Sequence, residues 1–135
     1  MTLLEHVRSH TASLLNRLDI QVRLATAKTD EESVHDLRVA IRRLRECLRT
    51  FEDLFPAAAR KNVRKELRKL MKSAERVRST DIALELLKKA GMGESAAHMM
   101  ELREQRALHC SALREELKAV AGRSDTRTWH EALGL

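Results

Sequence analysis

The 135-residue sequence contains few of the residues that β-rich folds and phosphate loops need. It has four Gly, one Pro, two Phe, one Trp and no Tyr. Sandwiches and barrels need many turns, and turns draw heavily on Gly and Pro, so an all-β fold is excluded. The shortage of Gly also argues against a Gly-rich phosphate-binding loop. The lack of aromatic rings argues against a single-stranded nucleic-acid platform, because such surfaces stack bases on aromatic side chains.

Cysteine is scarce as well, since Cys47 and Cys110 stand alone without a C-x-x-C pair or a Cys/His cluster at metal-ligand spacing. We interpret both as small hydrophobic residues in a reducing cytosol, with a disulfide between them as the alternative. Residues 1–15 are polar and amphipathic, unlike a signal peptide, and no run of 18 apolar residues occurs. The sequence therefore predicts a cytoplasmic protein without a membrane span, a metal site or a cofactor.

What the sequence does contain is helical periodicity. Hydrophobic residues make up 43% and charged residues 34%, which suits one folded domain over residues 1–135. Apolar residues recur every three or four positions in long amphipathic segments. Short connections between such segments predict an all-α, antiparallel helical bundle of about four long helices and a short one. The predicted helices are 3–27, 34–55, 57–77, 80–90 and 94–121.

Capping residues set the expected ends of these helices. Asp30 or Ser33 is the expected N-cap of the second helix, and Pro56 is expected to close it. The tail, residues 123–135, is too short and irregular for an assignment. The side chains that could dock the tail on the bundle are Trp129, Ala132 and Leu133.

The net charge of +6 is unevenly distributed. Residues 38–78 contain 14 Lys and Arg against five Asp and Glu, a net charge of +9, which leaves −3 for the rest of the chain. The sequence therefore predicts a cationic helical hairpin, residues 34–78, on a slightly acidic body. Like charges on one helix face repel, so this hairpin favours an anionic partner that relieves the repulsion.

The charges of the hairpin are ordered by face. At 100° per residue, four arginines of the first helix lie within about 60° of one another, with a histidine beside them. In the second helix basic residues recur every four positions. A solvated face with ion pairs is the alternative, but such faces usually mix signs, and the guanidinium fork fits phosphate oxygens. The first row is His35, Arg38, Arg42, Arg45 and Arg49; the second is Arg60, Arg64, Arg68 and Lys72, flanked by Lys61, Lys65 and Lys69.

His35 permits two interpretations. It is either a polar residue at a helix start or a further donor of the same anion site. The other five histidines form no metal-ligand pattern, and we interpret them as structural or surface residues.

The run Val-His-Asp-Leu-Arg-Val-Ala-Ile-Arg-Arg-Leu-Arg over residues 34–45 resembles the CHAD domain (conserved histidine α-helical domain) family. The resemblance extends over residues 34–87, through Glu66-Leu-Arg68, Lys72 and Arg78. It implies a non-catalytic helical domain that binds inorganic polyphosphate through histidine and basic residues. It also implies a link to polyphosphate metabolism or polyphosphate granules.

Two departures from the family pattern stand out. Where members have a Leu-Gly pair and an Arg-Asp-x-Asp motif, this sequence has Ala74-Glu75 and Arg78-Ser79-Thr80-Asp81. A typical member is also about twice as long and built from two related helical halves. This chain corresponds to one half of such a domain, and two copies in a symmetric homodimer would supply both halves.

The candidate site is a cationic surface for polyphosphate. A nucleic-acid-binding helical domain is the alternative, because the same basic face and a pI near 9.8 support it. A metal-dependent phosphohydrolase would need clustered carboxylates, which the pattern lacks, so no catalytic residue is expected. The candidate residues are His35, Arg38, Arg42, Arg43, Arg45, Arg49, Arg64, Lys65, Arg68, Lys69, Lys72 and Arg78, with Arg78 taken from the resemblance alone.

Overall fold

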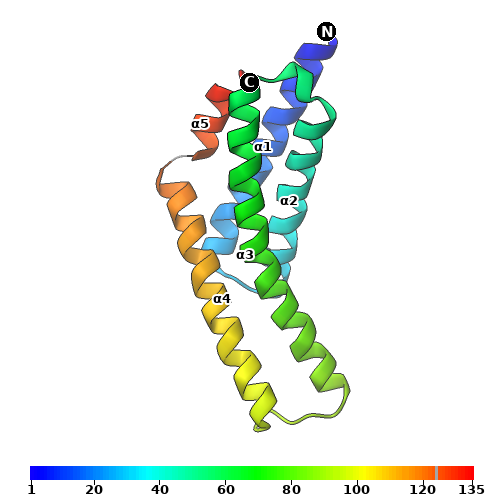
Figure 1. Cartoon of the computed structure of the whole chain (residues 1–135), viewed down its shortest axis with the longest axis vertical. Coiled ribbons are helices and arrows are strands. Elements are labelled where there is room, and N and C mark those ends of the chain that lie inside the picture. Colours follow the sequence, from blue (N-terminus) through cyan, green and yellow to red (C-terminus); the bar gives the residue numbers. More distant parts are fainter. Residues whose placement is uncertain (124) are drawn as a thin grey trace.

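A computed structural model describes residues 1–123 and 125–135. These residues contain helices and no strand, which confirms the predicted all-α fold. The described residues form five α-helices and one short 3₁₀ helix (Figure 1). Their bounds are α1 Leu3–Ala27, α2 Glu31–Thr50, η1 Glu52–Leu54, α3 Ala57–Lys89, α4 Ala97–Gly122 and α5 Asp125–Ala132.

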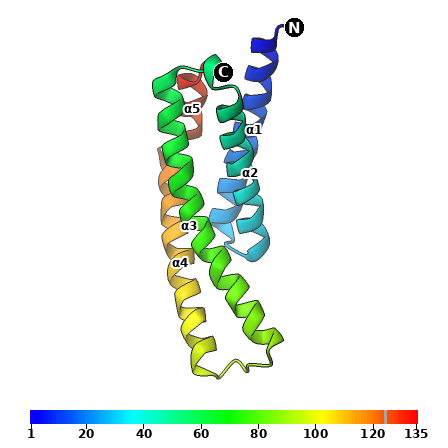
Figure 2. The same ribbon diagram turned by 45° about the vertical axis from the view of Figure 1, so that its right-hand side comes forward.

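The four long helices run antiparallel in chain order, and α5 follows the end of α4 and packs on α1. Both termini lie at one end of the bundle (Figure 1). At the other end α3 and α4 continue past the α1–α2 connection as a projecting helical hairpin, visible in both views (Figure 2). We call this projecting part, residues 82–105, the arm. No helix in the described part of the chain has the length and apolarity needed to cross a membrane.

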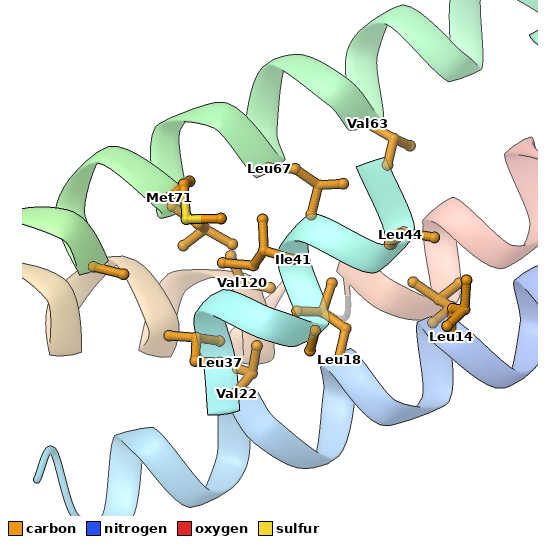
Figure 3. Close-up of a cluster of buried hydrophobic side chains, with 14 of the residues drawn as sticks. Leu14, Leu18, Val22, Leu37, Ile41, Leu44, Val63, Leu67, Met71 and Val120 are labelled. Carbon is orange, nitrogen blue, oxygen red and sulfur yellow. The ribbon is translucent and has the colours of Figure 1, made fainter. Parts of the chain in front are cut away.

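The hydrophobic core lies between α1, α2 and α3, with α4 and α5 closing one side (Figure 3). Leu18, Ile41, Leu44 and Leu67 are completely buried at its centre. Each helix contributes residues three or four positions apart, so the periodicity read from the sequence produces one continuous core. Cys47 and Cys110 are buried on α2 and α4, as expected of small hydrophobic residues, and both are free thiols.

The start of α2 follows from a side-chain cap. Asp30 Oδ1 accepts a hydrogen bond from the Ser33 amide at 2.8 Å, which identifies Asp30 as the N-cap among the two candidates. The same bond lowers the pKa of the Asp30 carboxyl. α2 ends at Thr50, five residues before the predicted end, because Phe51 leads into η1 instead of continuing the helix.

The predicted break between residues 77 and 80 is wrong, because α3 is one continuous helix. No Gly or Pro interrupts it, and the Thr80 hydroxyl donates to the carbonyls of Arg76 and Val77 rather than capping a new helix. α3 ends at Lys89, two residues before Gly91, whose positive φ of 84° suits a helix C-terminus.

The tail forms α5, for which the sequence supported no assignment. Trp129 and Leu133 are buried, as predicted, whereas Ala132 is exposed and does not dock. The Thr126 hydroxyl donates a hydrogen bond to Asp19 Oδ1 at 3.1 Å, and this bond connects α5 to α1. At the arm, α4 begins at Ala97, three residues after its predicted start, because Glu94 lies in the turn and accepts hydrogen bonds from Arg103.

Candidate polyanion-binding surface

The rotation of α2 is fixed by its apolar stripe. Leu37, Ile41, Leu44 and Leu48 are completely buried against α1 and α3. This leaves the arginine row of α2 on the side that borders α3. Arg42 and Arg49 are exposed there, and Arg38 and Arg45 are half-buried.

Four arginines from two helices line one hollow of about 270 Å³. Arg42, Arg45 and Arg49 come from α2 and Arg64 from α3, with Glu46 as the single acidic residue of the lining. We call this the α2–α3 hollow. Within residues 1–123 and 125–135, none of these four guanidinium groups has a carboxylate oxygen within 4.0 Å. Their donors are therefore available to an external anion.

The other candidate residues are distributed around this hollow. His35 is exposed in the first two turns of α2, and Lys65, Arg68 and Lys69 are exposed on the outer side of α3. Arg43 lies on the opposite side of α2, in a separate groove that Arg17 of α1 also lines. Lys72 lines a different groove, between α3 and α4. The structure thus brings Arg42, Arg45, Arg49 and Arg64 together and places Arg43 and Lys72 elsewhere.

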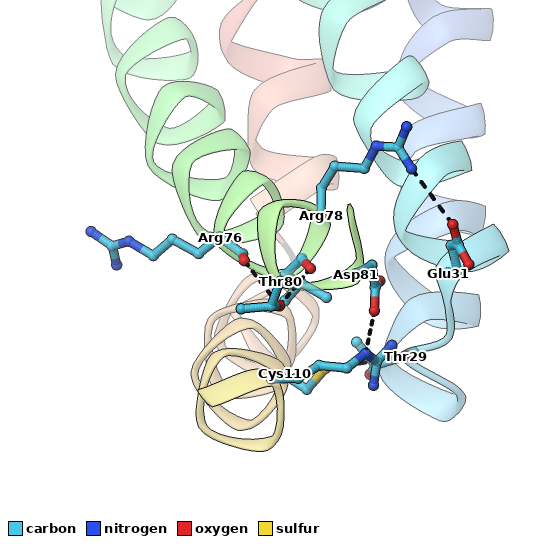
Figure 4. Close-up of polar contacts among 9 residues, drawn as sticks. Thr29, Glu31, Arg76, Arg78, Thr80, Asp81 and Cys110 are labelled. Atoms are coloured by element: carbon cyan, nitrogen blue, oxygen red, sulfur yellow. Dashed lines mark hydrogen bonds and ion pairs between the residues drawn. The ribbon is translucent and has the colours of Figure 1, made fainter. Parts of the chain in front are cut away.

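Arg78 is the only one of the twelve candidates with an ion pair in the part of the chain that the structure describes. Its Nη1 lies 3.7 Å from Glu31 Oε1, so Arg78 connects α3 to the first turn of α2 (Figure 4). Both side chains are at least one-third exposed, so the pair contributes little to stability. Arg60 at the start of the α3 row is also engaged, because its Nη1 donates to the Glu52 carbonyl at 2.8 Å.

Two residues that line the groove between α3 and α4 were not among the candidates predicted from the sequence. Arg76 and His109 line the α3–α4 groove together with Lys72. The four-residue spacing of the α3 row continues from Lys72 to Arg76, and this continuation is the signal that could have identified Arg76. No spacing rule identifies His109, because it reaches the groove from α4.

A second polar cluster joins the arm to the bundle beside the α1–α2 connection. Asp81 on α3 forms an ion pair with Arg106 on α4, and Arg106 also donates to the Thr29 carbonyl at 3.3 Å (Figure 4). The hydrogen bond to Asp81 raises the pKa of the Arg106 guanidinium, and burial raises the pKa of the nearby Cys110 thiol. Because its pKa is raised, the Cys110 thiol stays protonated at neutral pH and is not suited to act as a thiolate nucleophile. In the described residues, no three His, Cys, Asp or Glu gather in a group that could hold a metal ion.

These features define an all-α bundle whose second and third helices carry a cationic surface. The family model of the CHAD domain matches residues 5–134, so the chain belongs to the CHAD domain family. The match covers nearly the whole chain, well beyond residues 34–87. CHAD domains are helical binding domains linked to polyphosphate and are not catalytic by themselves. No curated protein and no solved structure matches the chain.

Proposed function

We propose that this protein binds inorganic polyphosphate along the cationic surface of α2 and α3. The observation that carries the proposal is the α2–α3 hollow, where four arginines converge with one carboxylate. A guanidinium group offers a planar fork of donors that binds two phosphate oxygens at once. A chain of closely spaced phosphates can engage several such forks in succession. Membership of the CHAD domain family supports the same ligand class.

The proposed contacts extend beyond the hollow to the rest of the cationic surface. The protein acts as a binding module in this proposal, without a catalytic group, a metal ion or a cofactor, and its place is in the cytoplasm or at polyphosphate granules. The proposed contacts are His35, Arg38, Arg42, Arg43, Arg45, Arg49, Arg64, Lys65, Arg68, Lys69, Lys72 and Arg78.

A competition experiment tests the ligand class. Labelled long-chain polyphosphate is bound to the protein and then challenged with unlabelled polyphosphate or duplex DNA at equal phosphate concentration. We expect polyphosphate to displace the label and DNA to displace little of it, because the closely spaced phosphates of one chain can engage several neighbouring guanidinium forks in succession. The affinity should fall steeply with salt, as counterion release requires. Equal or stronger displacement by DNA would favour the nucleic-acid alternative.

We further propose that two copies form a homodimer that brings their cationic surfaces to a common groove. The arm supports self-association, because Ile82, Leu86 and Met100 are 41%, 61% and 55% exposed on it. Residues 82–105 carry four acidic and three basic residues, so this part of the surface has almost no net charge. Contact between two copies at the arm therefore adds little charge repulsion, and a polyanion bound in the common groove relieves the repulsion between the two cationic surfaces.

Light scattering on a size-exclusion column tests the dimer. We expect twice the chain mass of 15.5 kDa for the native protein and a shift toward the monomer for Leu86→Glu. Leu24→Glu is the matched control, since Leu24 on α1 is similarly exposed at 52% and should leave the dimer intact. A native monomer that binds polyphosphate at full strength would contradict the dimer.

A further inference from the structure

The basic residues of α3 wind around the helix instead of forming one straight row. A four-residue step turns an α-helix by about 400°, so each successive residue is displaced by about 40°. Arg64 lines the α2–α3 hollow, whereas Lys72 and Arg76 line the groove on the α4 side. Figure 4 shows this displacement near the end of the row. Arg76 extends to one side of α3, and Arg78 extends to the opposite side, where it meets Glu31. The row therefore crosses the outer surface of α3 obliquely, from one neighbouring helix to the other.

The groove at the far end of this path is suited to an anion. It measures about 550 Å³. Lys72 and Arg76 contribute two positive charges against the one carboxylate of Glu75, and Ser79 and His109 add polar groups. The hydroxyl of Thr80 in the same wall donates to main-chain carbonyls and is not free as a donor.

The cations of this path lack the ion-pair partners that the cations of the arm have. On the arm, Lys88, Lys89 and Arg103 each lie within 4.0 Å of a glutamate carboxylate. Across the described residues, no carboxylate lies that close to any member of the path between the two cavities. Unpaired like charges four residues apart on a helix repel one another, and a bound anion relieves this repulsion. The members of the path are Arg64, Arg68, Lys72 and Arg76.

We propose that the α3–α4 groove is a second anion subsite, which holds one part of a polyphosphate chain whose other part lies in the α2–α3 hollow. The chain crosses α3 over the exposed Arg68. This inference rests on the proposed function and adds a second place of contact to it. Arg64 and Arg76 are twelve residues apart, a rise of about 18 Å along the helix. Only chains that span this distance reach both subsites, so affinity increases with chain length until the span is covered.

Binding of tripolyphosphate and of long-chain polyphosphate by the full chain tests this arrangement. Tripolyphosphate is too short for the span and should occupy the α2–α3 hollow in every variant. For Lys72→Gln/Arg76→Gln we expect about tenfold weaker binding of the long chain, and a log–log salt slope that is smaller by about 1.4, because two phosphate contacts are lost. Its affinity for tripolyphosphate should change less than about twofold.

The control variant Arg8→Gln/Arg127→Gln removes the same charge from exposed positions on α1 and α5 and should leave both affinities within about twofold. An equal loss for both ligands in Lys72→Gln/Arg76→Gln, or no loss for the long chain, would overturn the second subsite alone. Failure of the native protein to bind either ligand would overturn the proposed function itself. Circular dichroism confirms that each variant keeps its helices.

Discussion

Replacing Arg42 and Arg45 together with Glu is expected to abolish polyphosphate binding, with a rise in Kd of at least about 100-fold, or about 2.7 kcal/mol. The α2–α3 hollow would then hold three carboxylates and two guanidinium groups instead of one and four. Neither arginine has an ion pair among the described residues, and neither belongs to the core, so the fold should persist. Titration calorimetry measures the binding, and circular dichroism measures the helicity.

The matched control for this variant is Arg8→Glu/Arg127→Glu, which changes the net charge by the same amount on α1 and α5. At physiological salt, charges farther away than the screening length of about 8 Å act weakly, so this control should bind within about threefold of the native protein. The milder variant Arg42→Lys/Arg45→Lys keeps the positive charges but loses the planar guanidinium forks. Its affinity should lie between that of the native protein and that of Arg42→Glu/Arg45→Glu. Full binding by Arg42→Glu/Arg45→Glu would show that the ligand binds elsewhere.

The second large effect is expected at the junction between the arm and the bundle. Asp81→Ala should lower the free energy of unfolding by about 3 kcal/mol, because it leaves the Arg106 charge without its partner in a partly buried place. The Asp81 side chain is 9% exposed and that of Arg106 is 26% exposed. Urea unfolding measures the loss, and the double variant Asp81→Ala/Arg106→Ala should recover part of it.

An exposed pair of the same chemistry provides the comparison. Arg103 Nε donates to Glu94 at 2.7 Å, but both side chains are more than 40% exposed, so Glu94→Ala should cost less than about 1 kcal/mol. Asp81→Ala should still bind polyphosphate, since Asp81 does not line the cationic surface. Magnesium-dependent release of phosphate from polyphosphate, lost in Asp81→Ala, would contradict a structural role and indicate a hydrolase.

The helices could be predicted where local chemistry decides them. The bounds of α1, residues 3–27, agree with the apolar spacing, and Asp30 caps α2 through its own side chain. The continuity of α3 could not be predicted in this way. Ser, Thr and Asp in succession at residues 79–81 are typical of a helix start. In the structure Thr80 satisfies its hydroxyl within the helix, and Leu84 is buried in the α3–α4 hairpin, so tertiary packing overrides the local preference.

The candidate surface also has one part that the sequence predicts and one part that it does not. On α2 a single buried stripe determines which side faces outward, so periodicity alone places Arg42, Arg45 and Arg49 together. On α3 the neighbours on either side differ, with α2 beside Arg64 and α4 beside Lys72. The sequence contains no information on which helix occupies which side, so the turn of the basic row from one cavity to the other became visible only in the fold.

The scarcity of aromatic residues also has a spectroscopic consequence. Trp129 is the sole tryptophan, there is no tyrosine, and its indole is buried against the bundle at the end that holds both termini. Intrinsic fluorescence therefore reports on that end alone, whereas circular dichroism sums over every helix, including the arm. If the arm frays before the bundle melts, the two signals will have different midpoints, and their separation measures the local stability of the arm.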